Sequence, residues 1–525
     1  MRTLLLIILA ALLPAQAMAA QLTVGSGQTY ATVALAMAAA SEGDTIQVHG
    51  IANHSASSPV TWKADVCMFG NDGASITEQY GVGDVAFATL ADCGYVEIRD
   101  IAFVGFQRYA EAAGAGNYGG CFNCTSSGAP LDSVSFYDCT FTSCVAGDAV
   151  TGETGLGGAV YCGGGVVSLF DGCTFDTCET ELNSEAASGG GAIYAAGNCT
   201  ITDCQFTDCV ANGTTQGFDV FGGGARIDGA AVSITGTRFD NCTAEYGGAV
   251  LVWRAAGGTL AMSDCVFDSC AAVERAGALY LEHGTAAISG IEFDYCTCDS
   301  AGGAFATDAN LTATGLEFYG CSAKYGGAVL LASGWLGTYV PAPPSTWTRC
   351  TFQGDSATWG GAIYYPGRPA GGNNLGITLD HCVMVDNKAD STGSCVYLEQ
   401  SAGGQQTTLE VNNSIVFLAD NYAMAASGED LDQITFSLSC SDTVSTSPAT
   451  CRLWTPSCAT CIDEDPVFCD FTDDDTINDD FRLQGTSPCF ALTGCGYIGV
   501  HDWCGGDCTG CWSVDQGRMV RRIGN

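Results

Sequence analysis

Cys139-Thr-Phe141-Thr-Ser-Cys144, followed by Gly157-Gly158-Ala159-Val160-Tyr161, is the most informative part of this sequence, because both of its parts recur along the chain. The first part reads Phe-x-x-Cys, and the second reads Gly-Gly-Ala followed by an apolar residue. The repeated phenylalanines lie between 25 residues (Phe293 to Phe318) and 34 residues (Phe141 to Phe175) apart. Self-similarity at such a period is the signature of a repeat architecture.

Each repeat carries two short apolar runs bounded by Gly, Asp, Asn and Ser, a pattern typical of β-strands. The linkers between the runs show no helical period. One coil per repeat, with equivalent strands stacked in parallel sheets about 4.8 Å apart, accounts for both observations. We therefore expect about a dozen coils and an internal ladder of Phe141, Phe175, Phe206, Phe239, Phe267, Phe293, Phe318 and Phe352.

The residue after each Gly-Gly-Ala triplet is also expected to point inward, and the paired glycines to allow a tight turn with positive φ. This column comprises Val160, Ile193, Val250, Leu279, Phe305, Val329 and Ile363. When Gly223-Gly224-Ala225 is taken as the triplet of its coil, Arg226 falls in the same column and marks that coil as unusual.

The alternation of Gly-Gly-Ala-Ile/Val/Leu with Phe-x-x-Asn resembles the repeat of the chlamydial polymorphic outer-membrane proteins, over about Cys121 to Asn387. Cysteine replaces the asparagine at Cys144, Cys178, Cys209, Cys242, Cys270, Cys296 and Cys321. The resemblance implies a right-handed parallel β-helix of the pectate-lyase-like superfamily, at a bacterial surface and often adhesive.

The organisation expected along the chain has four parts. Residues 1–19 read as a secretory signal, with Arg2, an apolar run and a small-residue cleavage site. Residues 20–110 form an N-terminal cap and the first coils, with a short helix over Ala31–Ser41 covering the open end of the core. Residues 111–426 form the repeat β-helix, and residues 427–525 form the terminal coils and a Cys-rich cap. No other run of about 18 apolar residues occurs, so no transmembrane segment is expected in the mature chain.

The fold predicted is therefore all-β: a right-handed parallel β-helix with a short capping helix and a Cys-rich C-terminal cap. The formal charge of −40 disfavours nucleic acid and anionic membranes as partners and favours cations or a neutral glycan.

Thirty-one cysteines in an exported chain favour disulfides, because equivalent Cα atoms of neighbouring coils lie within disulfide range. The candidates are Cys139, Cys144, Cys173, Cys178, Cys204, Cys209, Cys265 and Cys270. Buried thiols that act as small apolar side chains are the alternative for some of them. Because the number of cysteines is odd, at least one has no partner within the chain.

An acidic stretch near the C-terminus offers closely spaced oxygen ligands suited to calcium, the one cofactor the sequence suggests. Its candidate ligands are Asp470, Asp473, Asp474, Asp475 and Asp479. The alternative is a solvated acidic loop, since the spacing of an EF-hand is absent.

Catalytic motifs of the pectate-lyase-like hydrolases are missing, and no catalytic residue is assigned. A lyase would need an arginine base beside carboxylates, a role for which Arg99 with Asp100 or Arg226 with Asp228 are conceivable. Each is more simply a surface pair. Three functions stay open: a non-enzymatic adhesin or glycan-binding scaffold, which the sequence favours, a polysaccharide lyase or hydrolase, and a purely structural envelope protein. The expected location is secreted or at the cell surface of a Gram-negative bacterium.

If the residue after each triplet alanine points inward, the next residue points outward. That column reads Tyr161, Tyr194, Ile227, Leu251, Tyr280, Ala306, Leu330 and Tyr364. Its tyrosines, Tyr161, Tyr194, Tyr280 and Tyr364, are predicted to bind a glycan or a surface protein of another cell. Two alternatives are that the parity is reversed and that loops cover the column.

Overall fold

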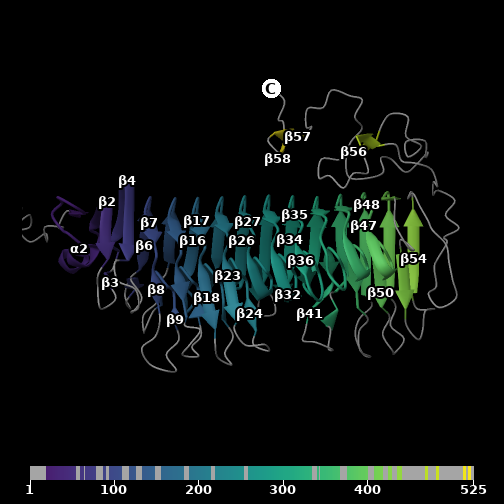
Figure 1. The fold of residues 1–525 in the computed structure, drawn as a ribbon, viewed down its shortest axis with the longest axis horizontal. Helices are drawn as coiled ribbons and strands as arrows, with labels where there is room; N and C mark the ends of the chain where they lie inside the picture. Colours follow the sequence, from purple (N-terminus) through teal and green to yellow (C-terminus); the bar gives the residue numbers. More distant parts are fainter. Residues whose placement is uncertain are drawn as a thin grey trace, which may run out of the picture.

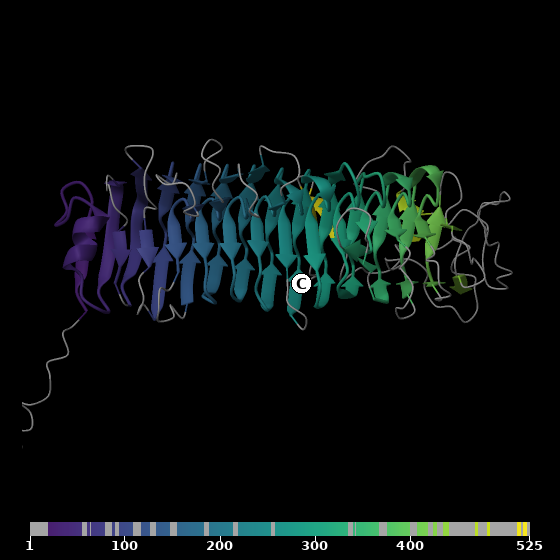
Figure 2. The ribbon, with the colours of Figure 1, turned by 90° about the horizontal axis from the view of Figure 1, so that it is seen from below.

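The chain winds into a long coil of parallel strands (Figures 1 and 2). This computed structural model describes residues 19–417, except 55–59, 64, 79–86, 90–93, 109–116, 126–132, 148–154, 183–187, 214–218, 254–257, 334–339, 342, 367–374 and 400–406. It also describes residues 424–427, 434–439, 468–470, 480–483, 512–515 and 518–521. Three sheets of 26, 13 and 11 strands, here called A, B and C, build the coil, and all of their strand pairs are parallel. The predicted parallel β-helix is therefore confirmed.

Sheet A contributes one or two strands to each coil. Its longer strands are β1 (Gln21–Val24), β2 (Thr45–His54), β4 (Cys67–Glu78), β6 (Tyr95–Arg99), β11 (Ser133–Tyr137), β16 (Val167–Asp171), β21 (Cys199–Thr202), β26 (Ala231–Thr235), β30 (Thr259–Ser263), β34 (Thr285–Ser289), β38 (Asn310–Thr314), β43 (Ser345–Thr348), β47 (Leu375–Asp380), β51 (Thr407–Asn412) and β54 (Ile434–Ser439). Its shorter strands are β7 (Ala102–Val104), β12 (Thr140–Thr142), β17 (Thr174–Asp176), β22 (Gln205–Thr207), β27 (Arg238–Asp240), β31 (Val266–Asp268), β35 (Glu292–Asp294), β39 (Glu317–Tyr319), β44 (Thr351–Gln353), β48 (Val383–Val385) and β52 (Ile415–Phe417).

From β8 to β37, strands of sheet C and then of sheet B complete the coils, in that order along the chain. Sheet C comprises β8 (Gln107–Arg108), β9 (Asn117–Tyr118), β13 (Val145–Ala146), β14 (Gly155–Leu156), β18 (Glu179–Leu182), β19 (Ser188–Gly189), β23 (Val210–Gly213), β24 (Val220–Phe221), β28 (Thr243–Tyr246), β32 (Ala271–Arg275) and β36 (Thr297–Cys298). Sheet B comprises β3 (Val60–Trp62), β5 (Phe87–Thr89), β10 (Phe122–Cys124), β15 (Val160–Cys162), β20 (Ile193–Ala195), β25 (Ala225–Ile227), β29 (Val250–Trp253), β33 (Leu279–Glu282), β37 (Phe305–Thr307), β40 (Val329–Leu330), β46 (Ile363–Tyr365), β50 (Val396–Glu399) and β53 (Met424–Ser427). The two-stranded pairs are β41 (Ala332–Ser333) with β42 (Val340–Pro341), β45 (Ser356–Trp359) with β49 (Lys388–Thr392), β55 (Phe468–Asp470) with β56 (Asp480–Leu483), and β57 (Trp512–Asp515) with β58 (Arg518–Arg521).

The predicted phenylalanine ladder is confirmed. Phe141 pairs in register with Phe175, and the series continues coil by coil to Phe352. Neighbouring rings stack with their centroids 4.7–5.0 Å apart, and all are buried. Phe103 extends the ladder at its N-terminal end, where its ring lies 5.1 Å from that of Phe141. Each ring is therefore covered on both faces, which maximises the apolar surface removed from water.

The column after the Gly-Gly-Ala triplet points inward, as predicted, but the position given to Arg226 was wrong. Ala225 pairs with Ile193 and Val250, so Ala225 occupies the inward column in its coil. The triplet of that coil is Gly222-Gly223-Gly224. Arg226 instead pairs with Tyr194 and Leu251 and belongs to the outward column.

The cysteines of the Phe-x-x-Cys motif form a buried column that bonds to the backbone of the preceding coil. The Cys178 thiol donates to the Phe141 carbonyl at 3.5 Å, and Cys321 donates to Phe293 at 3.4 Å. The amide of Asn387 makes the equivalent bond to Phe352 at 2.9 Å. The thiol thus takes the place that the Asn387 amide holds in its own coil, as a weaker donor to the equivalent carbonyl.

The predicted N-terminal cover is present as helix α2 (Val33–Ala39), at the purple end of Figure 1. Thr32 caps it by accepting a hydrogen bond from the Leu35 amide at 3.3 Å. Val33 and Met37 point into the core and shield the apolar interior of the first coil. Among the described residues, no helix is long and apolar enough to cross a membrane. The predicted signal segment and most of residues 427–525 lie outside the described residues.

The cross-linking of cysteine columns stays a prediction. All twenty cysteines whose side chains are described are thiols in the structure, including the eight candidates, and nineteen of them are buried. We expect chain exported under oxidising conditions to lose about 2–4 kcal/mol of stability for each bridge that a reductant removes. Peptide mass spectrometry without reduction measures the pairing. If nearly all thiols are recovered free, the bridges do not exist, and the cysteines of the column make thiol-to-carbonyl hydrogen bonds instead.

Candidate functional site

The predicted tyrosine column points outward, but only part of it reaches the surface. Tyr161 and Tyr194 are half-buried, and their rings stack with centroids 5.0 Å apart. Tyr118 covers the other face of Tyr161, at 4.6 Å. The stack therefore presents ring edges and hydroxyls to the outside, whereas the prediction assumed flat faces that a sugar could cover. The assignment of Ile227 to this column was also wrong, because Ile227 is buried and pairs with Ala195 and Val252.

The rest of the column is covered, which was the second alternative. Tyr280 and Tyr364 are 3% and 4% exposed. They belong to an apolar cluster outside the main core, the outer cluster, which contains Tyr246, Leu251, Ala276, Tyr280, Ala301, Ala306, Leu330, Ala332, Tyr364 and Tyr397, with Phe221, Tyr325 and Trp359 packed against it. Its covering side chains stand just before the glycine turn. For example, the Tyr325 ring lies 5.1 Å from those of Trp359 and Tyr364. A ligand could reach Tyr280 or Tyr364 only by displacing this cluster.

Where the half-buried stack of Tyr161 and Tyr194 meets the outer cluster, Arg226 organises a polar network. Its Nε and Nη2 donate to the two carboxylate oxygens of Asp228, each at 3.2 Å, and Nη1 donates to the Ser188 carbonyl at 3.4 Å. The Tyr194 hydroxyl donates to the same carboxylate at 2.8 Å. Arg226 is 6% exposed, so this pair is not the surface pair that the sequence suggested.

Aromatic rings enclose the same guanidinium. It lies 4.7 Å from the centroid of Phe221 and 5.4 Å from that of Tyr194. The positive charge thus contacts two ring faces as well as a carboxylate. Planar groups fixed in this way are pre-organised to bond a ligand in one orientation only.

Two carboxyl groups on neighbouring coils complete this region. Asp219 and Glu245 are half-buried, and the Val220 amide donates to Glu245 at 3.3 Å. Burial raises the pKa of Asp219 to about 6. Burial and repulsion by Asp219 and Glu274 raise the pKa of Glu245 to about 7. We call Tyr194, Asp219, Arg226, Asp228 and Glu245 the Arg226 cluster. Perturbed titrations beside a buried charge are typical of functional sites.

Other candidates are weaker. Arg99 pairs with Glu97 rather than with Asp100, and lies over the Tyr137 ring at 3.7 Å. It is an ordinary surface contact. The predicted calcium ligands lie outside the residues with described side chains. Among described residues, no group of three or more His, Cys, Asp or Glu side chains is placed to hold a metal ion.

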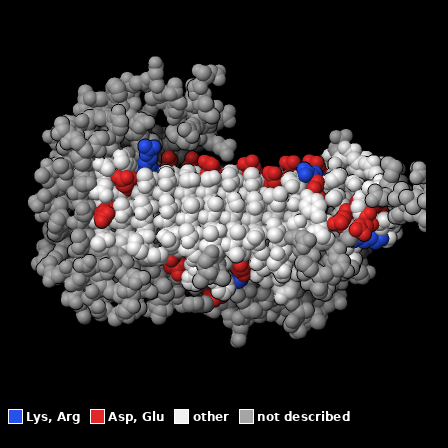
Figure 3. All heavy atoms as spheres, turned by 180° about the vertical axis from the view of Figure 1, so that it is seen from behind, with Lys and Arg blue, Asp and Glu red and all other residues white. Residues whose placement is uncertain are grey.

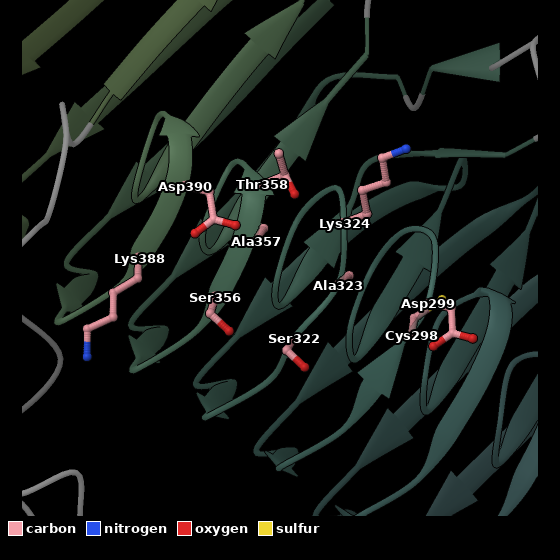
Figure 4. A pocket seen from close by; sticks show the side chains of 10 residues that line it. All are labelled: Cys298, Asp299, Ser322, Ala323, Lys324, Ser356, Ala357, Thr358, Lys388 and Asp390. Carbon is pink, nitrogen blue, oxygen red and sulfur yellow. The ribbon is translucent and has the colours of Figure 1, made fainter.

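A shallow depression of about 300 Å³ lies on the outer side of β36, β45 and β49 (Figure 4). It is lined by Cys298, Asp299, Ser322, Ala323, Lys324, Ser356, Ala357, Thr358, Lys388 and Asp390. Figure 4 shows that the two lysines point away from each other, and Lys388 bonds to Asp386 at 3.1 Å. The polar side chains that line the depression do not point toward a common centre, so their arrangement is not that of a binding site.

A separate acidic row on the outside of sheet A is expected to make stability depend on pH. Glu292 and Glu317 are in register on β35 and β39, and Asp294 lies beside them. Burial and these neighbouring carboxylates raise the pKa of Glu317 to about 7, and burial with the repulsion of Glu292 and Asp268 raises that of Asp294 to about 7. The folded chain therefore holds these protons more tightly than the unfolded chain, a contribution that is full in acid and is lost as the pH rises through about 7.

We expect the free energy of unfolding to fall between about pH 5 and pH 8, and Glu317→Gln to remove about 1–2 kcal/mol of that fall. Denaturant titrations at several pH values measure the free energy of unfolding of both chains. Glu410→Gln, at an exposed carboxylate, is the matched control. A Glu317→Gln variant with the pH profile of the unchanged chain would show that this row is not responsible.

Comparison with known proteins agrees with the observed architecture. The family described as "Right handed beta helix region" matches residues 116–340, which include the phenylalanine ladder from Phe141 to Phe318 and the Arg226 cluster. The chain is thus similar to right-handed parallel β-helix repeat proteins, as predicted. No curated protein matches the sequence.

Proposed function

We propose that this chain is an exported, non-enzymatic β-helix that binds a carbohydrate at the Arg226 cluster. The polar groups of the cluster suit sugar hydroxyls, which both donate and accept hydrogen bonds. Asp228, Glu245 and the Tyr194 oxygen, whose proton is donated to Asp228, supply acceptors, while the N–H groups of Arg226 supply donors. The formal charge of −40 disfavours a polyanionic glycan and favours a neutral sugar or an amino sugar.

The observation that carries this proposal is the placement of Arg226. Its guanidinium is almost completely buried on the outer side of the coil and paired with Asp228. A buried ion pair is a poor source of stability, since desolvating both charges costs about as much as their attraction returns. Its presence beside half-exposed tyrosines therefore favours recognition over scaffolding. The resemblance to surface-exposed bacterial repeats supports the same assignment and a location at the cell surface.

A glycan array probed with the mature chain tests the proposal. With the best-bound glycan, Asp228→Asn is expected to weaken binding roughly 10-fold to 100-fold, because one charge-assisted bond and the orientation of Arg226 are lost. Asp240→Asn is the matched control, since Arg238 pairs with Asp240 at the same two-residue spacing on sheet A. Equal affinities for the two variants would reject the Arg226 cluster as the binding site.

The second candidate function is polysaccharide cleavage, favoured by Asp219 and Glu245. Two carboxyl groups with pKa values of about 6 and 7 can act as proton donor and acceptor near neutral pH. Reducing-sugar and unsaturated-product assays on neutral and acidic polysaccharides measure this. Activity that Asp219→Asn or Glu245→Gln abolishes would replace the binding proposal with an enzymatic one.

A further inference from the structure

A second surface, on a different side of the coil, has an unusually regular composition. The outward residues of β21, β26, β30, β34, β38 and β43 form what we call the hydroxyl face. They are Thr200, Thr202, Ala231, Ser233, Thr235, Thr259, Ala261, Ser263, Thr285, Ala287, Ser289, Asn310, Thr312, Thr314, Thr346 and Thr348. None of these sixteen is charged or aromatic, and all are exposed or half-exposed.

These side chains form a two-dimensional lattice. One row runs through Thr202, Thr235, Ser263, Ser289, Thr314 and Thr348, so that six successive coils each place a hydroxyl at the same position. A parallel row runs from Thr200 to Thr346 in the same unbroken register. Strand geometry sets the repeat at about 4.8 Å along the coil axis and about 6.6 Å between rows.

The lattice is flat and open. Two of the connections that border it are short: two residues separate β34 from β35 (290–291), and two separate β37 from β38 (308–309). Figure 3 shows a broad, level band without Lys, Arg, Asp or Glu, bordered by acidic residues. Because parallel strands in continuous register move little, the spacing of the hydroxyls is fixed before any partner arrives.

The hydroxyl face has no charged residue along its six coils, whereas charged residues stand beyond both ends of its hydroxyl row and on the neighbouring face. The hydroxyl row begins after Asp171 and ends before Asp380, which occupy the same row on the coils beyond it. On the neighbouring face of sheet A, Asp240, Asp268 and Asp294 follow one another on successive coils. In a chain with 57 acidic and 17 basic residues, a neutral area of six coils complements a partner that is itself uncharged.

We propose that the hydroxyl face binds the surface of crystalline water, that is, ice. Ice is rigid, flat, neutral and periodic, and it presents hydrogen-bond donors and acceptors at regular intervals. Threonine and serine hydroxyls can bond to lattice waters, while the methyl groups of threonine and alanine order the water held between the rows. The proposal does not depend on the Arg226 cluster, which lies on sheets B and C.

Other partners fit this face less well. Protein interfaces depend on large anchors such as Trp, Tyr and Arg, and none stands among the sixteen residues of the lattice. Sugar chains are commonly held by aromatic faces, which this lattice also lacks. A small-residue hydroxyl lattice has too little apolar area to hold a second copy of the chain tightly.

The test uses the full mature chain in three assays: inhibition of ice recrystallisation, thermal hysteresis, and adsorption of fluorescently labelled chain to an ice hemisphere. Thr312→Lys places a long charged side chain in the middle of the lattice. It should reduce activity about tenfold or more, because it holds the surfaces apart over several coils. Thr142→Lys, on β12 of the neighbouring face, is the matched control and should retain activity. Circular dichroism and thermal melting show that both variants are folded.

Three results would overturn the proposal. The first is an unchanged chain with no effect on ice. The second is equal ice activity in Thr312→Lys and the parent. The third is adsorption to microcrystalline cellulose or chitin, or a dimer seen by light scattering, that Thr312→Lys abolishes while ice is unaffected. Glycan binding through Asp228 is measured separately, so failure here leaves the proposed function standing, and the reverse also holds.

Discussion

Gly277→Ala should cost about 3 kcal/mol or more and open the coils on either side of it. A Cβ atom on Gly277 would lie 2.0 Å from the Gly303 carbonyl oxygen and 2.4 Å from the Thr297 carbonyl oxygen. Both are backbone atoms of the next coil, so no side chain can rotate to make room. Stacking would have to widen at this turn, with the loss of several inter-coil hydrogen bonds.

The preceding residue is the matched control, with the opposite sign. Ala276 occupies the position that glycine holds in most other coils, and its φ is 54°. That conformation costs a residue with a Cβ about 1–2 kcal/mol. Ala276→Gly relieves this strain but loses a buried methyl group of the outer cluster, worth about 0.8 kcal/mol. A net gain of about 0.5 kcal/mol is expected, so the two neighbouring glycine positions separate backbone conformation from lack of space.

Hydrogen exchange followed by mass spectrometry is the suitable measurement, because a solenoid need not unfold in one step. In Gly277→Ala, protection should fall first in peptides covering β29 to β37. A variant with wild-type protection throughout would show that the coils can separate at this turn without loss. The sequence predicted that both glycines of the pair are needed for the conformation of the turn. In the structure the first glycine has a positive φ, and the second allows the backbones of neighbouring coils to approach closely.

The sequence predicted those parts of the fold that depend on a periodic pattern. The phenylalanine ladder and the inward column were correct, because each motif recurs often enough to set its own register. The register failed at Arg226, where Gly222-Gly223-Gly224-Ala225 can be aligned to the triplet in two ways that differ by one residue. A shift of one residue moves every side chain of a strand to the opposite face.

The candidate sites were harder to predict, because they depend on what lies next to a strand in space. The outward direction of the tyrosine column was right, but Tyr246, Tyr325 and Trp359 stand before the glycine turn and belong to no motif. Their packing over the column follows from the bend between sheets C and B. The Arg226 cluster also joins residues of several coils. The hydroxyl face was missed because alternating threonines indicate only an exposed strand when each strand is considered alone.

Phe267→Ala is the second change with a large expected effect, about 3–5 kcal/mol. The Phe267 ring lies 4.9 Å from that of Phe239 and 5.0 Å from that of Phe293, so its removal leaves a void between two rings. Neighbouring rings are held by their own coils and cannot close over the gap without breaking strand register.

The outward neighbour on the same strand provides the control for this change. Val266→Ala removes apolar atoms from a half-exposed side chain and should cost less than about 1 kcal/mol. Because each coil contacts only the next, Phe267→Ala should also divide the unfolding transition, with coils on the two sides of β31 losing protection at different denaturant concentrations. A single transition with a loss close to that of Val266→Ala would mean that the ladder contributes little and that backbone hydrogen bonds between coils hold the helix together.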